Sequence, residues 1–99
     1  MASFKNLIAR LSQRTAMYIG KNDIFYLDAF ISGWLFCPIE DISDLHLFGD
    51  FQEWLRKKFN IQGTQGWAKI ILFQCFDEKQ ALEYFFKLFN EFLEEIETE

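Results

Sequence analysis

The hydrophobic residues of this chain recur mostly at helical spacing, three or four positions apart. The first such series is Phe4, Leu7, Ile8 and Leu11. It predicts an amphipathic helix over residues 4–14, with Ser3 as its N-cap and polar residues on the opposite side. Residues 15–20 continue no such series, and we expect them to form a loop.

A second helix is expected over residues 24–36, capped by Asn22 or Asp23 and ended by Pro38. Apolar residues surround it on nearly every side, which predicts a buried helix at the centre of the fold. Gly33 inside this helix costs about 1 kcal/mol relative to alanine. Such a glycine is usually accepted where a neighbouring backbone approaches closely, so we expect a close approach here.

Two further amphipathic series predict helices in the second half of the chain. Asp50 and Glu53 form a capping pair before a helix that ends near Asn60, and Asp77 with Gln80 forms another before the last helix. The apolar faces contain Phe51, Trp54, Leu55 and Phe59 in the first helix, and Leu82, Phe85, Phe86, Phe89, Phe92, Leu93 and Ile96 in the second.

The segment from Trp67 to Phe76 is ambiguous, because a short apolar run fits a strand as well as a helix. We favour a helix capped by Thr64, since no second strand is evident to pair with it. Residues 1–99 are therefore predicted to form a single compact all-α domain of about five helices. An α+β fold with a short strand near residues 67–75 is the alternative.

Composition and charge narrow the class of function. The formal net charge is −5 and the pI is near 4.8, so we expect no direct binding of nucleic acid. The N-terminus is polar, and no apolar stretch reaches the roughly 20 residues that span a bilayer, so we expect neither a secretory signal nor membrane association. Cys37 and Cys75 are expected to be inert buried thiols. A cytoplasmic protein is predicted.

Residues that support catalysis are scarce. His46 is the single histidine, so no multi-histidine metal site is possible, and the chain has no glycine-rich phosphate loop. His46 beside Asp44 is a minimal acid–base pair, which keeps a small hydrolase as a further hypothesis. We predict that the protein is not an enzyme and binds no metal or cofactor.

Charge is segregated along the chain. Residues 22–53 carry seven acidic side chains and no Lys or Arg, and residues 88–99 carry five more. The first block consists of Asp23, Asp28, Glu40, Asp41, Asp44, Asp50 and Glu53. Like charges repel, so folding alone gives no reason to collect them, whereas a basic partner does.

Three of these seven acids have expected roles in folding. Asp23 and Asp50 are predicted caps, and Asp28 is expected to lie in the buried helix against Arg14. The other candidates for partner binding are Glu40, Asp41, Asp44 and Glu53, with Phe48 as an exposed apolar anchor.

Two stretches of the sequence carry a recognisable pattern. The first is Arg14-Thr15-Ala16-Met17-Tyr18-Ile19-Gly20 followed by Leu27, Phe30 and Gly33-Trp34, with Thr15-Ala16 where Pro-Gly is usual. The second is Phe51-x-x-Trp54-Leu55, then Gly66-Trp67-Ala68-Lys69-Ile70-Ile71, then Asp77-Glu78-x-x-Ala81-x-x-x-Phe85-Phe86-x-Leu88. The pattern resembles that of small bacterial immunity proteins of toxin systems, including those of contact-dependent growth inhibition.

The resemblance implies a cytosolic protein that binds and neutralises a cognate toxin domain. Many such toxins are nucleases with basic clefts, so an acidic inhibitor fits the expected partner. We expect the immunity protein to be a monomer or a weak dimer. The alternative is a small structural or adaptor domain that self-associates through exposed aromatic residues.

Overall fold

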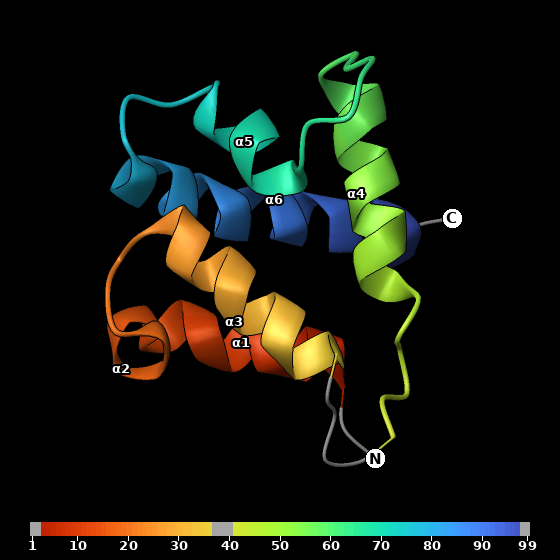
Figure 1. Cartoon of the computed structure of the whole chain (residues 1–99). Helices are drawn as coiled ribbons and strands as arrows, with labels where there is room; N and C mark the ends of the chain where they lie inside the picture. Colours follow the sequence, from red (N-terminus) through yellow and green to blue (C-terminus); the bar gives the residue numbers. More distant parts are fainter. Residues whose placement is uncertain (1–2, 37–40, 98–99) are drawn as a thin grey trace.

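The computed structural model describes residues 3–36 and 41–97, and this part of the chain forms six helices and no strand (Figure 1). The helices are α1 (Phe4–Gln13), α2 (Thr15–Ile19), α3 (Ile24–Phe36), α4 (Leu47–Lys58), α5 (Trp67–Leu72) and α6 (Glu78–Glu97). The predicted all-α class is confirmed, and the strand alternative is wrong because α5 occupies that segment. No helix in the described ranges is both long and apolar enough to cross a bilayer.

Helix α6 is the central element of the fold. It packs against α3, α4 and α5, and α1 reaches it through the ring of Phe4, whose centroid lies 5.8 Å from that of Phe89. In Figure 1, α6 runs behind the other helices, and α4 crosses it near the C-terminus. The helix therefore offers one long apolar face on which the shorter helices assemble.

Aromatic rings, many of them packed edge to face, form the core. The fully buried ring of Phe51 in α4 lies 5.6 Å from Phe85, 5.1 Å from Phe89 and 5.6 Å from Phe92, measured between centroids. These three partners follow one another at i, i+4 and i+7, on one face of α6. Truncation of such a residue to alanine typically costs about 3–5 kcal/mol.

Helix α3 is not the buried central helix that its composition predicted. It buries Ile24, Leu27 and Ile31, but Phe25 and Tyr26 are 38% and 49% exposed. Because α6 takes the central place, α3 covers it with one face only. An unusually apolar surface therefore remains on the outer side of α3.

The close backbone approach expected at Gly33 is absent. Among the described residues, no heavy atom outside its own helix lies within 4 Å of the position that a Cβ would take. The glycine faces open space on the outer side of α3, and packing does not require it.

Residues 15–19 form the short helix α2 instead of the predicted loop. The Thr15 hydroxyl donates a hydrogen bond to the Leu11 carbonyl at 2.7 Å. Gly20 ends the helix in the left-handed conformation, with a φ of 87° that favours glycine. The Thr15 hydrogen bond and the Gly20 C-cap stabilise this helix, which is too short to be recognised from hydrophobic spacing.

Helix α4 begins at Leu47, so the prediction that Asp50 is its N-cap is wrong. The N-cap is His46, and Asp50 lies inside the first turn, where its amide donates to the His46 carbonyl at 3.1 Å. Leu47 and Phe48 are buried, and their burial extends the apolar face of α4 by one turn toward the N-terminus.

The predicted caps of the last two helices have different outcomes. Gly66 is the N-cap of α5 and makes no side-chain cap, so the prediction of Thr64 is wrong. Asp77 caps α6 as predicted, accepting from the Gln80 amide at 2.8 Å. Gln80 completes the capping pair by accepting from the Phe76 amide at 2.7 Å.

Candidate partner-binding surface

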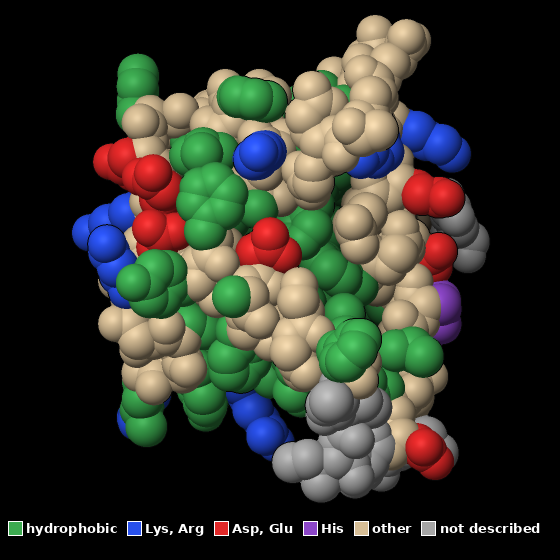
Figure 2. Space-filling view, viewed as in Figure 1, with side chains coloured by type: hydrophobic (Ala, Val, Ile, Leu, Met, Phe, Trp, Pro, Cys, Tyr) green, Lys and Arg blue, Asp and Glu red, His purple; other side chains and the backbone are tan. Residues whose placement is uncertain are grey.

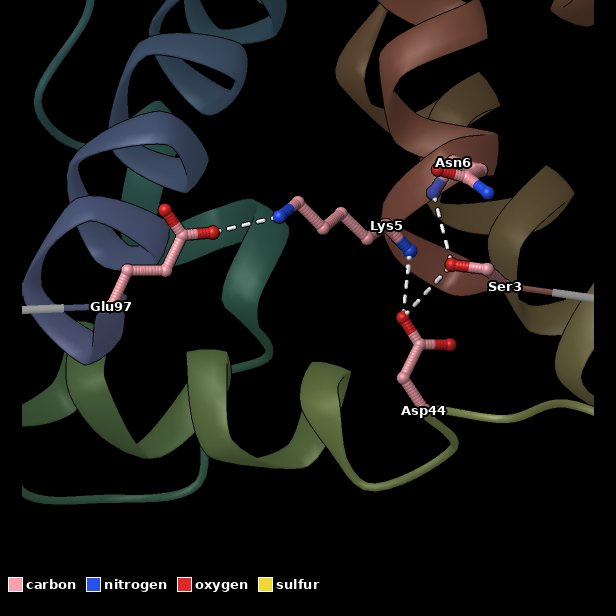
Figure 3. A network of polar contacts seen from close by, with 5 residues as sticks. All are labelled: Ser3, Lys5, Asn6, Asp44 and Glu97. Carbon is pink, nitrogen blue, oxygen red and sulfur yellow. Dashed lines mark hydrogen bonds and ion pairs between the residues drawn. The ribbon is translucent and has the colours of Figure 1, made fainter.

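Asp44 holds the N-terminus of α1 and is not a free surface charge. Its carboxylate accepts hydrogen bonds from the Lys5 amide at 3.0 Å and the Ser3 hydroxyl at 3.2 Å (Figure 3), and a further one from the Phe4 amide at 2.6 Å. Ser3 in turn accepts from the Asn6 amide at 3.2 Å, so its predicted role as N-cap is confirmed. The three free amides of the first turn are thus satisfied.

The electrostatics of this contact favour the ionised form of Asp44. Partial burial alone raises the pKa of its carboxyl, but the bonds from the Lys5 and Phe4 amides and the Ser3 hydroxyl outweigh burial and lower it. The contact joins residues about forty positions apart and fixes the segment before α4 against α1. Asp44 therefore has a structural role that the sequence did not predict.

Asp23 and Asp28 also have partners within the fold. Asp23 accepts a bond from the Phe25 amide at 2.8 Å and is confirmed as the cap of α3. Asp28 is half-buried and accepts from the Ser32 hydroxyl at 3.5 Å. The described residues contain no ion pair between Asp28 and Arg14, so that expectation is wrong.

Phe48 is a core residue and not an exposed anchor. Only 7% of it is exposed. Its ring centroid lies 5.1 Å from that of Phe4 and 5.4 Å from that of Trp67. It therefore links α1, α4 and α5, and its substitution would damage the fold before it affected any partner.

The other predicted binding residues lie in or just before α4. Glu40 falls outside the described residues. Asp41, Asp50 and Glu53 are exposed. Asp50 and Glu53 belong to an outward stripe of α4 that begins with His46 and ends with Lys57, at i, i+4, i+7 and i+11.

The C-terminal acidic block lies beside these α4 residues. The Trp54 indole donates to the Glu95 carboxylate at 2.8 Å, and the Lys58 ammonium lies 3.5 Å from Glu91. The two pairs show that the second half of α4 crosses the last turns of α6. Figure 1 shows the same crossing near the C-terminus.

Exposed acidic side chains from two distant parts of the sequence therefore lie on two helices that contact each other. We call this surface the acidic edge, and it consists of Asp50, Glu53, Glu94, Glu95 and Glu97. Lys5 pairs with Glu97 at 2.7 Å (Figure 3). No Lys or Arg of the described chain lies within ion-pair distance of Asp50, Glu53 or Glu94. The C-terminal acids were counted from the sequence but were not placed beside α4.

The described residues offer little to catalysis. They contain no group of three or more His, Cys, Asp or Glu side chains placed to hold a metal ion. His46 is mostly exposed, and its nearest carboxylate is Asp50 at 4.0 Å, not Asp44. Burial, with the Asp77 carboxylate nearby, raises the pKa of the Cys75 thiol, which keeps it protonated and weakly nucleophilic at neutral pH.

Comparison with protein-family models, with curated proteins and with solved structures gives no match for this chain.

Proposed function

We propose that the protein is an immunity protein, which binds a basic toxin domain in the cytoplasm through the acidic edge and neutralises it. The observation that carries the proposal is that the exposed acids of α4 and those at the end of α6 lie on two helices that contact each other. Keeping like charges together costs free energy, and a basic partner repays that cost on binding. A nuclease fits the description of the toxin, because an enzyme that holds a polyanion needs a basic cleft.

Trp54 gives the acidic edge an apolar component. It is half-buried between α4 and α6, its indole is fixed by Glu95, and its ring lies 5.3 Å from the Lys58 ammonium. Tryptophan is enriched among residues that dominate interface energetics. A basic partner that covered this edge would gain charge complementarity from the acids and apolar contact from the indole.

A growth assay tests the proposal. A basic toxin domain encoded beside this chain is expressed in bacteria, alone and with the chain. The wild-type chain should restore growth, whereas Asp50→Lys/Glu53→Lys should restore it poorly, since reversal of both charges opposes docking of a basic surface.

The matched control reverses two acids elsewhere. Glu78→Lys/Glu83→Lys makes the same change in net charge at exposed positions of α6, far from its acidic end. Each pair contains one acid in the first turn of its helix, so both variants lose a similar helix-dipole term. Equal protection by the two variants would exclude the acidic edge as the toxin-binding surface. Absence of protection by the wild type would contradict the immunity function itself.

Self-association is a second candidate, favoured by the exposed aromatic residues. Phe76 is 96% exposed, and Phe36 and Phe73 are also largely in solvent. Exposed phenylalanines of this kind suit an interface between copies of the chain. Sedimentation of the purified protein distinguishes the two functions, because the immunity function is compatible with a monomer, whereas a self-associating adaptor must form a stable oligomer.

A further inference from the structure

The outer side of α3 borders an open hollow of about 600 Å³ between α3, the loop after α4 and α5. Phe25 and Asp28 of α3 form one wall, and Lys69 with residues 63–66 and 68 forms the other. Figure 2 looks onto this side of the molecule, where an acidic group lies among hydrophobic and uncharged atoms over α3. The hollow is separate from the acidic edge, which lies where α4 crosses the end of α6.

The loop wall of the hollow is held in place by internal hydrogen bonds. The Arg56 guanidinium donates to the Gly63 carbonyl at 2.8 Å and to the Gln65 carbonyl at 2.5 Å. The loop leaves α4 through Asn60, whose φ of 53° is left-handed, and the Ile61 amide donates back to the Arg56 carbonyl at 2.9 Å. The wall is therefore formed before any ligand arrives, which lowers the entropic cost of binding.

Asp28 is the feature that points to a ligand. Its carboxylate is half-buried on an otherwise apolar helix, and its hydrogen bond from Ser32 is long, at 3.5 Å. No Lys or Arg in the described ranges forms an ion pair with it, although Lys69 lines the same hollow. A carboxylate at the wall of such a hollow is placed to accept hydrogen bonds from a cationic group.

We propose that this hollow binds an arginine side chain of a partner protein. Asp28 would accept two parallel hydrogen bonds from the planar guanidinium, a geometry that a lysine ammonium does not reproduce. The exposed ring of Phe25 would stack on the guanidinium plane at the mouth of the hollow. That the arginine comes from a toxin domain rests on the proposed function, whereas the chemistry of the hollow does not.

Titration of the isotope-labelled protein with N-acetyl-arginine amide, followed by NMR, tests the site without any toxin. The wild type should show amide shifts at Phe25, Asp28 and residues 63–66, and N-acetyl-lysine amide should bind more weakly. Asp28→Asn should weaken arginine binding about tenfold, because the amide lacks the charge and the second acceptor oxygen. Lys69→Gln should tighten binding severalfold by removing the like charge on the rim.

Asp41→Asn is the matched control, since it removes an exposed acid outside the hollow and should leave arginine binding unchanged. The spectrum of each variant also reports whether it is folded. Shifts outside the hollow, or equal affinity for wild type and Asp28→Asn, would overturn the site. Such a result would not affect the growth assay, which reports on the acidic edge.

Discussion

Asp44 and Asp50 lie six residues apart in the same acidic block and have opposite roles. Asp44 accepts three hydrogen bonds at the start of α1, whereas Asp50 faces solvent in the first turn of α4. The sequence predicts the reverse, with Asp50 as a cap and Asp44 as a free charge. Capping pairs within a few residues are visible in a sequence, but a carboxylate that caps a distant helix is not.

The regions around these two residues should therefore respond differently to substitution. The Asp44 carboxylate is hydrogen-bonded to two backbone amides and a hydroxyl of the same chain, so substitutions there should change the free energy of unfolding. At the acidic edge, Asp50, Glu53 and Glu94 form no ion pair with a Lys or Arg of the described residues, so their substitution should change binding. Stability and binding measurements on matched variants separate the two roles.

The largest expected effect on stability is that of Asp44→Ala. The substitution leaves the first-turn amides of α1 without their acceptor, and we expect a loss of about 2–3 kcal/mol in the free energy of unfolding. Asp50→Ala should change it by less than about 0.5 kcal/mol, as is usual for surface positions. Urea denaturation of both variants measures the difference, and equal losses would contradict the assigned roles.

The pH dependence of stability should follow Asp44. Its pKa is lowered from 3.8 in the folded state, so the folded protein holds this proton less tightly than the unfolded chain. The contribution is complete well above pH 3.8, declines as the pH falls through that value, and is lost below the folded pKa.

Asp44→Asn isolates this titration, since it keeps one acceptor oxygen and cannot ionise. Near pH 7 the wild type should be more stable than Asp44→Asn by about 1 kcal/mol, and near pH 2 the difference should shrink. Denaturation at the two pH values tests this. A difference that stayed constant would mean that the ionised form is not the one that holds α1.

Gly33→Ala should stabilise the protein, by about 0.5–1 kcal/mol. The outer side of α3 leaves room for the added methyl group, and alanine is the better helix former. Thermal unfolding measures the gain. Destabilisation would show that the outer side of α3 is packed against something else, as self-association would require.

The smallest expected effect is that of the Lys5–Glu97 pair. Both side chains are about half exposed, so solvent screens the pair and Glu97→Gln should cost less than about 0.5 kcal/mol. Denaturation at low and high salt checks this. A larger loss would mean that Glu97, like Asp44, stabilises the fold and is not available to a partner.

Local signals in the sequence predicted much of the fold. Helical spacing placed α1, α3 and α6 nearly at their observed bounds, and Ser3, Asp23 and Asp77 cap as predicted. The location of α3 was not predictable from its composition, because burial depends on which helix takes the centre. The longer α6 provides the aromatic face on which Phe51 packs. It therefore takes the centre of the fold, and α3 packs against it from the outside.

The candidate site was only partly predictable. Asp50 and Glu53 were identified from charge density, but their neighbours at the end of α6 are about forty residues away in sequence. The crossing of the two helices, marked by the contacts Trp54–Glu95 and Lys58–Glu91, brings their acidic segments close together. Phe48 was misassigned because its burial depends on rings from α1 and α5.

The acidic edge as the surface for a basic partner is tested most directly by association kinetics. The rate constant for binding of the purified chain to the proposed basic toxin domain is measured by stopped flow at low and high salt. For the wild type we expect fast association that slows as salt rises, and for Asp50→Lys/Glu53→Lys an association rate at least tenfold lower at low salt with a flatter salt dependence. Equal rates and equal salt dependence in the two proteins would contradict the proposal.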